Sequence, residues 1–570
     1  MHRRWLRWLP LLRWLPSYQR EDFARDLLAG VLVSVLLVPQ AVAYALLAGL
    51  PAHTGLYAAL LPLVAYALFG SSPVLAVGPV AVISLMTAAT IGSLGLEEPQ
   101  LRVAAAAALA VLTGAVLLAM ALLRLGVIVR FISHPVLNGF LAAAAVLIML
   151  SQVPVLFGLP PADGGAWQQL IRLPVEVPRV HAPTMVLGAF SLVMLALMSL
   201  YGARLLVACG TPEPAARLLA QLAPLAVLVL AALAAAHWSA GIAVVGSVPE
   251  GLPALSLPAP DMALWRQLLP AAVLIALVGF VESVSVAQAL AARRRSRIEP
   301  ERELIGTGAA NLAAGVSGGF PVAGGLSRSA LNFQVGAATP LAGVVTAGCI
   351  ALVLLFLSPL LAWLPRAAVA AVIVMAAASL VDWRAMLAAW RYNRADGLCM
   401  AVTLVTVLAV GIEAGILAGA GLSLALFLWR TSRPHIAVVG RVPGTEHYRN
   451  IRRHEVQTSA RVLAVRVDES LYFANTRFLE DRLLSEVAAR PDLQHLVLVC
   501  SAVNDIDASA LETLTRLTYG LADAGVTLHL AEVKGPVMDR LQRVDFAGTL
   551  GKGRIFLSTH SAMQSLERSD

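Results

Sequence analysis

The chain has 570 residues, of which 59% are hydrophobic and 13% are charged, about half of the charged fraction of a typical soluble domain. This composition excludes an ordinary soluble protein and predicts a large helical membrane domain. The formal net charge is +8. The basic residues lie beside apolar segments, so we expect contacts with membrane lipid headgroups and no nucleic-acid binding.

Residues 1–25 form a basic segment that precedes the first apolar run. The segment contains three tryptophans but lacks the long apolar core and the small-residue cleavage site of a signal peptide. We therefore expect an uncleaved segment at the cytoplasmic surface of the membrane. Its arginines are Arg3, Arg4, Arg7, Arg13, Arg20 and Arg25.

Residues 26–432 contain successive apolar runs, each about the 20 residues that a helix needs to cross a bilayer. We expect about fourteen spans, and we place the arginine-rich stretches on the cytoplasmic side. An even number of spans returns the carboxy terminus to the cytoplasm. The stretch after the eighth run carries Arg293, Arg294, Arg295 and Arg297.

The first span carries two polar side chains on one helical face. Gln40 and Tyr44 are four residues apart and follow Pro39, which should loosen the helix locally. The residues alone allow a structural role, in which Gln40 binds a carbonyl group that Pro39 leaves free and Tyr44 only packs.

Two glycine- and proline-containing breaks interrupt apolar runs in roughly corresponding positions of the two halves. One is Gly78-Pro79, and the other lies in residues 318–332, GGFPVAGGLSRSALN. Such paired breaks indicate the midplane binding site of a transporter. We expect a helix to begin near Leu326 and another after Gly78, each directing free backbone N–H groups at an anion.

The proposed anion ligands are the guanidinium group of Arg328, the hydroxyl group of Ser327 and the backbone N–H groups of Val80 and Ala81. Two helix N-termini contribute about half a positive charge each, so with Arg328 the site carries roughly +2 before any acid is counted. A total near +2 suits a dianion.

Glu282 is an acid in the middle of an apolar run. An intramembrane carboxylate is a functional-site hypothesis by default, and we predict that Glu282 binds and releases the coupling proton. In its ionised form it reduces the site to about +1, so the proton and a dianion would favour each other's binding. The alternative is a structural ion pair between Glu282 and Arg328.

Charged residues become frequent after residue 432, and we expect a linker over 433–459 and a small α/β domain over 460–570. Strands are predicted at 462–467, 496–500 and 526–530, and helices at 476–489, 508–522 and 536–544. In the loop before the second helix, Asp507 and Ser509 are candidate regulatory residues. The alternative is that one of them only caps the helix.

The chain resembles the sulfate permease family, known as SulP, or solute carrier family 26 in animals. Four stretches carry the resemblance in the family's order, together with a STAS-like carboxy-terminal domain. They are residues 38–50 (VPQAVAYALLAGL) with 55–57 (GLY), 77–81 (VGPVA), 279–287 (GFVESVSVA) and 318–332.

The resemblance implies two inverted seven-span repeats sorted into core and gate subdomains, a homodimer, and Gln40 and Tyr44 at the substrate. In soluble anti-sigma-factor antagonists the serine that matches Ser509 is phosphorylated. The Pro-Gln pair and the Ser-Arg motif most resemble the proton-coupled sulfate branch. The residue one turn after Glu282 is Val286, which offers no oxygen ligand to the Na⁺ of the sodium-dependent bicarbonate branch.

We therefore predict a secondary active transporter, not an enzyme, that carries sulfate with protons across a bacterial inner membrane and uses no cofactor. The four cysteines lack metal-type spacing, so no metal site is expected. The alternatives are a bicarbonate or dicarboxylate carrier coupled to sodium or protons, and an anion exchanger. A membrane-tethered signalling protein, whose STAS-like domain binds a cytoplasmic partner, is the rival from another class.

Overall fold

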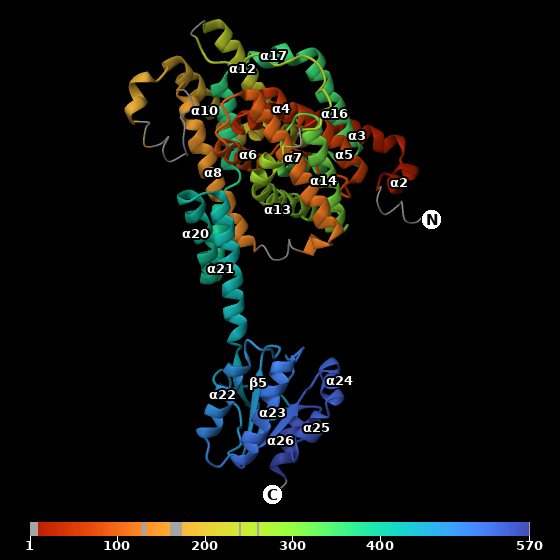
Figure 1. Ribbon diagram of the computed structural model, residues 1–570, viewed down its shortest axis with the longest axis vertical. Coiled ribbons are helices and arrows are strands. Elements are labelled where there is room, and N and C mark those ends of the chain that lie inside the picture. The colour runs from red at the N-terminus through yellow and green to blue at the C-terminus, as the bar shows by residue number, and fades with distance from the viewer. Residues whose placement is uncertain are drawn as a thin grey trace. The chain divides into compact units, whose positions relative to one another are not determined.

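The computed structural model describes residues 10–127, 133–159, 171, 174–238, 241–258 and 261–568. The first nine residues of the expected interfacial segment, with Arg3, Arg4 and Arg7, lie outside this description. The chain divides into two compact units, residues 1–420 and 421–570, and the boundary falls within helix α21 (Ile412–Ser432) (Figure 1).

The first unit consists almost entirely of helices. Nine helices among the described residues are long and apolar enough to cross a membrane, and the number of about fourteen spans stays a prediction. The helices are α2 (Leu11–Trp14), α3 (Arg20–Leu47), α4 (Ala52–Tyr57), α5 (Leu61–Phe69), α6 (Ala81–Ser93), α7 (Pro99–Leu122), α8 (His134–Leu156), α10 (Ala182–Ala208), α11 (Glu213–Gln221), α12 (Ala223–Trp238), α13 (Met262–Arg293), α14 (Pro300–Val316), α15 (Leu326–Val335), α16 (Leu341–Leu352), α17 (Ser358–Ala362), α18 (Arg366–Ala378), α19 (Trp383–Tyr392), α20 (Arg394–Ala409) and α21 (Ile412–Ser432).

These helices pack as two bundles. In the first bundle α3, α5, α7, α13, α14, α15 and α16 pack mainly against one another, and in the second bundle α8, α10, α18 and α20 do so. Glycines permit the closest approaches. A Cβ atom on Gly114 of α7 would lie 2.8 Å from the carbonyl oxygen of Gly308 on α14, and one on Gly315 would lie 2.6 Å from that of Ala107. Small residues at such contacts are typical of membrane helices.

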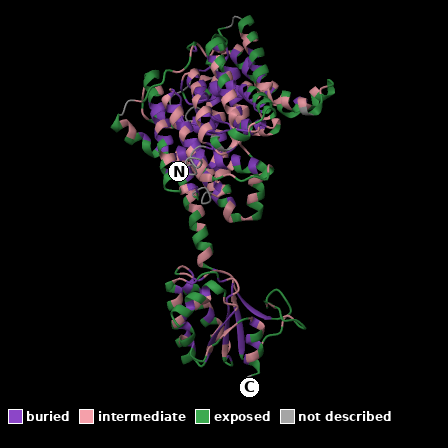
Figure 2. Ribbon diagram, turned by 90° about the vertical axis from the view of Figure 1, so that its right-hand side faces the viewer, coloured by how far each residue is buried: buried purple, intermediate pink, exposed green. Residues whose placement is uncertain are grey.

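Burial separates the inside of the helical unit from its outside (Figure 2). Buried residues fill the space between the helices, whereas large apolar side chains such as Leu122, Leu233 and Phe356 are exposed on the outside. A soluble protein rarely exposes so much apolar surface. The arrangement fits a lipid environment around the unit.

Two short, buried strands pair with each other in the first bundle. Strand β1 (Val77–Gly78) pairs in antiparallel register with β2 (Ala323–Gly324). Helix α6 begins three residues after β1, and α15 begins at Leu326. The predicted breaks are therefore confirmed, and the pairing brings the N-termini of these two half-helices together.

The second unit is a six-stranded sheet with helices, in the order β4-β3-β5-β6-β7-β8. Strands β5 to β8 are parallel, and β3 is antiparallel to both of its neighbours. The strands are β3 (Ile436–Arg441), β4 (Tyr448–Asn450), β5 (Val462–Val467), β6 (His495–Val499), β7 (Thr527–Ala531) and β8 (Ile555–Phe556), and the helices are α22 (Thr476–Ala488), α23 (Ala508–Asp523), α24 (Gly535–Arg543), α25 (Phe546–Thr549) and α26 (Thr559–Glu567). The six predicted elements all form, within one residue of their expected ends.

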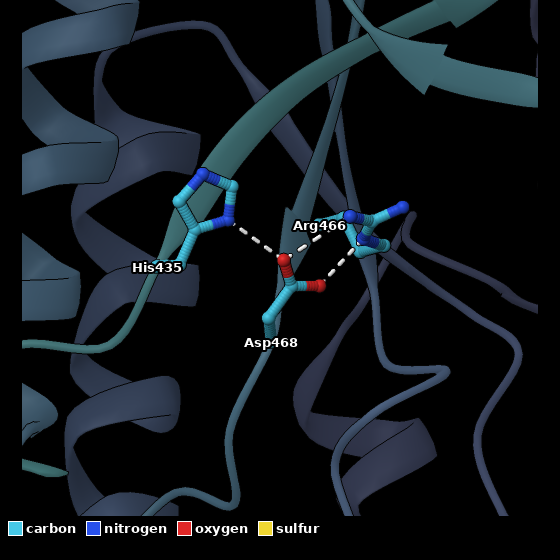
Figure 3. A network of polar contacts seen from close by, with 3 residues as sticks. All are labelled: His435, Arg466 and Asp468. Carbon is cyan, nitrogen blue, oxygen red and sulfur yellow. Dashed lines mark hydrogen bonds and ion pairs between the residues drawn. The ribbon is translucent and has the colours of Figure 1, made fainter. Parts of the chain in front are cut away.

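The segment 433–459 is not a simple linker, because it contributes β3 and β4 to the sheet. A polar network fixes the start of β3 to the end of β5 (Figure 3). His435 Nδ1 lies 2.7 Å from one carboxylate oxygen of Asp468, and Arg466 Nε donates to the other at 2.6 Å. Burial alone would raise the pKa of Asp468, but these two hydrogen-bond partners lower the pKa below its ordinary value.

Candidate functional site

The site is built on the paired strands β1 and β2. Their extended backbone lies inside the bundle, where its polar groups need hydrogen-bond partners. The N–H group of Gly324 donates to Ser283 Oγ on α13 at 2.8 Å. The N–H group of Ala76 donates to Ser329 Oγ on α15 at 3.0 Å, and the N–H group of Gly325 donates to the carbonyl oxygen of Ala76 at 3.0 Å. These bonds fix β2 to α13, and they fix the residue before β1 to the start of α15.

A polar stripe on α14 holds the segments that lead into both strands. Asn311 forms two bonds of 2.9 Å with the backbone of Val322, one to its N–H group and one to its carbonyl oxygen. Two turns earlier on the same helix, Glu303 accepts from Tyr66 at 2.7 Å and from the N–H and hydroxyl groups of Ser71. Sequence reasoning singled out Glu282 alone as an acid deep in the spans and missed Glu303.

Arg328 is the centre of the site. Its side chain is 1% exposed, and its Nη1 donates to Gln40 Oε1 at 3.2 Å. Two further guanidinium nitrogens, Nε and Nη2, are buried and have no hydrogen-bond partner. The guanidinium group packs on the backbone of two glycines, because a Cβ atom would lie 2.6 Å from it on Gly325 and 3.5 Å from it on Gly78.

Gln40, Tyr44 and Glu282 lie near the guanidinium group of Arg328. Their roles at a substrate stay predictions. The alternative for Gln40 is not observed, since its described partner is Arg328 and not a backbone carbonyl group. The ion-pair alternative is also not observed, because Glu282 and Arg328 form no salt bridge and Glu282 Oε2 is buried without a partner.

The two half-helices direct their N-termini toward this cluster. Val80 is the N-cap residue of α6, and Gly325 is the N-cap residue of α15. At neither helix does an N-cap side chain accept a hydrogen bond from the first N–H groups. The first N–H groups of such helices have no partner within the helix and attract anions. With Arg328, the three groups give the site roughly the +2 that the sequence indicated.

A cavity of about 830 Å³ reaches the site from one side. Gln40 and Ser327 belong to its lining, and most of the other lining residues come from α10, α11, α12 and α18. Arg328, Tyr44, Val80 and Ala81 are buried behind that lining. The cavity therefore separates the first bundle from part of the second and ends beside the proposed anion ligands.

In the second unit the capping interpretation of the loop before α23 is confirmed. Asp507 is the N-cap residue, and its Oδ1 accepts from the N–H group of Ala510 at 2.8 Å. Ser509 is exposed in the first turn of the helix. A phosphate group there would meet free N–H groups, and a regulatory role stays a prediction.

A buried histidine in the same sheet has fixed hydrogen-bond roles. The N–H group of Arg554 can only donate, so His529 Nδ1 accepts from it at 3.1 Å, and the ring proton must lie on Nε2, which faces His495 Nδ1 at 3.1 Å. The side chain of His529 is 1% exposed. Burial, followed by the neighbouring His495 and Arg554, lowers the pKa of His529 to about 4. The folded unit therefore keeps this ring neutral.

Comparison with known families and relatives gives a consistent result over nearly the whole chain. Residues 23–403 match the model of the sulfate permease family, and residues 453–562 match the STAS domain. The chain is 36% identical to "Sulfate transporter 4.1, chloroplastic" of Arabidopsis thaliana, with 97% of this chain and 82% of that protein covered. It is 33% identical to a "Probable sulfate transporter" of Mycobacterium tuberculosis, with 98% of both chains covered.

Solved structures show the same fold. The murine solute carrier 26 family member A9 anion transporter, solved in an inward-facing state, superposes with a TM-score of 0.88 at 23% identity, over 98% of this chain and 94% of that chain. The transmembrane domain of a cyanobacterial bicarbonate transporter superposes with a TM-score of 0.61 at 24% identity, over 70% of this chain and 98% of that chain. At these identities the likeness concerns the fold alone.

Proposed function

Because this chain belongs to the sulfate permease family, we propose that it is a secondary active transporter that carries sulfate together with a proton. The chain is an integral membrane protein with a carboxy-terminal STAS domain, and its family and relatives are transporters, not enzymes. Relatives that are named sulfate transporters support sulfate as the transported anion.

One observation carries the proposal of a doubly charged anion. The guanidinium group of Arg328 is buried between two helix N-termini, and two of its nitrogens lack partners. Burying an unpaired charge costs several kcal/mol unless a partner arrives. An oxyanion provides that partner, and its remaining oxygens accept from Ser327, Gln40, Tyr44 and the N–H groups of Val80 and Ala81.

Glu282 is the proposed carrier of the coupled proton. It lies near Arg328 without an ion pair, and its Oε2 has no partner, so the carboxyl group can take up a proton without breaking a salt bridge. A proton on Glu282 removes one negative charge from the site, and the dianion then binds more tightly. By linkage the bound dianion raises the affinity for the proton equally.

We further propose a bacterial inner-membrane location with cytoplasmic termini. The end of α15 bonds to the turn before α12 through Gln334 and Gln221 at 2.9 Å, and Arg294 at the end of α13 donates to Ala337 at 2.8 Å. Gln221 and Gln334 also line the cavity. The positive-inside rule puts the arginines after α13 in the cytoplasm, so the cavity opens to that side. A homodimer is proposed from the family resemblance.

The test is uptake by the purified full chain in proteoliposomes. Labelled sulfate, bicarbonate and fumarate are offered with an inward proton gradient, an inward sodium gradient or neither. We expect sulfate uptake that requires the proton gradient. Sodium-driven uptake, or bicarbonate or fumarate as the better substrate, would replace the proposal by one of the alternatives.

Substitution of the central arginine tests the site itself. Arg328→Ala should abolish sulfate binding, whereas Arg328→Lys should restore only part of it, because lysine keeps the charge but lacks the planar fork of donors. Thermal melting of the detergent-purified variants controls for folding. Sulfate binding by Arg328→Ala at wild-type affinity would refute this site.

A further inference from the structure

Helix α19 is short and unusually exposed for an element of this unit. None of its ten residues is buried. Three large apolar side chains at helical spacing form one face, and their exposed fractions are 65% for Trp383, 58% for Leu387 and 48% for Trp390. This apolar face is larger than a water-exposed helix normally carries.

The opposite side of α19 already has protein partners. The helix packs against α20 and α8, and its residues Ala385, Met386 and Ala389 are only partly exposed. The ring of Trp390 rests on Gly397 of α20. The face therefore meets α20 at Trp390, whereas its other two side chains, Trp383 and Leu387, remain more than half exposed.

Two exposed arginines border this face. Arg384 and Arg391 are seven residues apart, so both lie on the same side of the helix, next to the apolar stripe. Arg394 follows just after the helix and is also exposed. The acids of the region lie at helix starts. Asp382 caps α19 through the N–H group of Ala385, and Asp396 is in the first turn of α20.

Helix α19 forms the last part of the candidate span Arg366–Tyr392, which begins with α18. The C-cap residue of α18, Ser379, lines the cavity together with Gln334 and Gln221. We therefore place α19 at one end of the span, on the side of the arginines that follow α13. Tryptophan and arginine side chains are typical of the boundary between lipid headgroups and acyl chains.

We propose that α19 is a docking helix for anionic phospholipids. Trp383 and Leu387 enter the boundary between headgroups and acyl chains, while Arg384 and Arg391 bind the phosphodiester of a phosphatidylglycerol-type lipid. Neutral lipids would satisfy the apolar face equally well, so the arginines make the site selective for negative charge. This inference does not depend on which anion is transported.

The test uses the full chain in vesicles of phosphatidylcholine with a fixed minority of phosphatidylglycerol. Bromine, which quenches tryptophan fluorescence on contact, is placed on the acyl chains of the phosphatidylglycerol or on an equal amount of phosphatidylcholine. We expect stronger quenching by the brominated phosphatidylglycerol at low salt, with an enrichment of roughly fivefold per arginine. Trp383→Phe should remove much of this difference.

Variants without the two arginines separate the selection of anionic lipid from the insertion of the apolar face into the membrane. Arg384→Gln with Arg391→Gln should make the two brominated lipids quench equally, while quenching itself persists. The matched control, Arg449→Gln with Arg452→Gln on the exposed surface of the second unit, should keep the wild-type preference.

Two outcomes would overturn the proposal. Equal quenching of the wild type by both lipids would show that no anionic lipid is selected. If Trp383 is quenched by neither lipid and Leu387→Cys cross-links to a second copy of the chain, protein covers α19 and lipid does not.

Discussion

Gly325 and Gly78 provide a matched pair of substitutions beside one guanidinium group. Gly325 has φ −88° and ψ 126°, a backbone conformation that alanine adopts without strain. Its added Cβ atom would nevertheless lie 2.6 Å from Cζ and Nη2 of Arg328, whereas ordinary contact begins at 3.4 Å. Gly325→Ala should therefore displace the guanidinium group by roughly 0.8 Å, because the glycine backbone itself is fixed by hydrogen bonds.

Such a displacement should act mainly on anion binding. A misplacement of about 1 Å at a reacting centre costs up to about 100-fold, so we expect sulfate affinity to fall about 10- to 100-fold, or about 1.4–2.7 kcal/mol. The melting temperature should change much less, since Nε and Nη2 of Arg328 have no hydrogen-bond partner that the displacement would break.

Gly78→Ala is the control, because its Cβ atom would meet Nη2 of Arg328 at 3.5 Å, an ordinary contact. The assay is sulfate binding by isothermal titration calorimetry, followed by counterflow in proteoliposomes. Wild-type affinity in Gly325→Ala would refute the close fit around Arg328. An equal loss in both variants would show that the strands, and not the guanidinium group, respond to the added methyl groups.

Three further predictions concern the proton, the STAS loop and the buried histidine. Glu282→Gln imitates the protonated carboxyl group, so sulfate counterflow should persist while accumulation driven by an inward proton gradient is lost; accumulation at the wild-type level would make Glu282 a structural residue. Ser509→Glu should alter the transport rate or the stability of the second unit, and a changed ratio of sulfate to bicarbonate uptake would contradict this. The pKa of His529 in the folded state, about 4, lies below its unfolded value of about 6.5, so only the unfolded state gains a proton between these values. Lowering the pH from 8 to 5 should therefore cost the second unit about 2 kcal/mol of unfolding free energy. In urea titrations His529→Gln should lose this part of the pH dependence, and an unchanged dependence would argue against a buried neutral ring.

The sequence predicted the elements whose cause is local. The helix beginning at Leu326 follows from the glycines and Pro321 before it, which cannot continue a helix. The strands and helices of the STAS domain follow from apolar alternation. The break at Gly78 and the positive charge at Arg328 also follow from the local sequence, without contacts to distant residues.

The remaining features depend on contacts between distant residues. Glu303 looked like one of several acids at the start of a helix, and only the fold brings it to Tyr66, 237 residues away. Ser283 belongs to the same motif as Glu282, yet its bond to Gly324 could not be read from spacing. Strand β3 was not predicted, because the frequent charged residues around it indicated a linker. It forms because its backbone pairs with the neighbouring strand β5.

The pairing of β1 and β2 also determines how the site can move. Ala76 is bonded to both Gly325 and Ser329, so separating the two half-helices would leave backbone groups unpaired inside the bundle. We therefore expect the two half-helices to move together in any conformational change. The facing wall includes the apolar side chains of Leu195 and Val372, but Gln221 of the same wall bonds to Gln334 at the end of α15 at 2.9 Å. Any movement of the half-helices along this wall would therefore have to break the bond between Gln334 and Gln221.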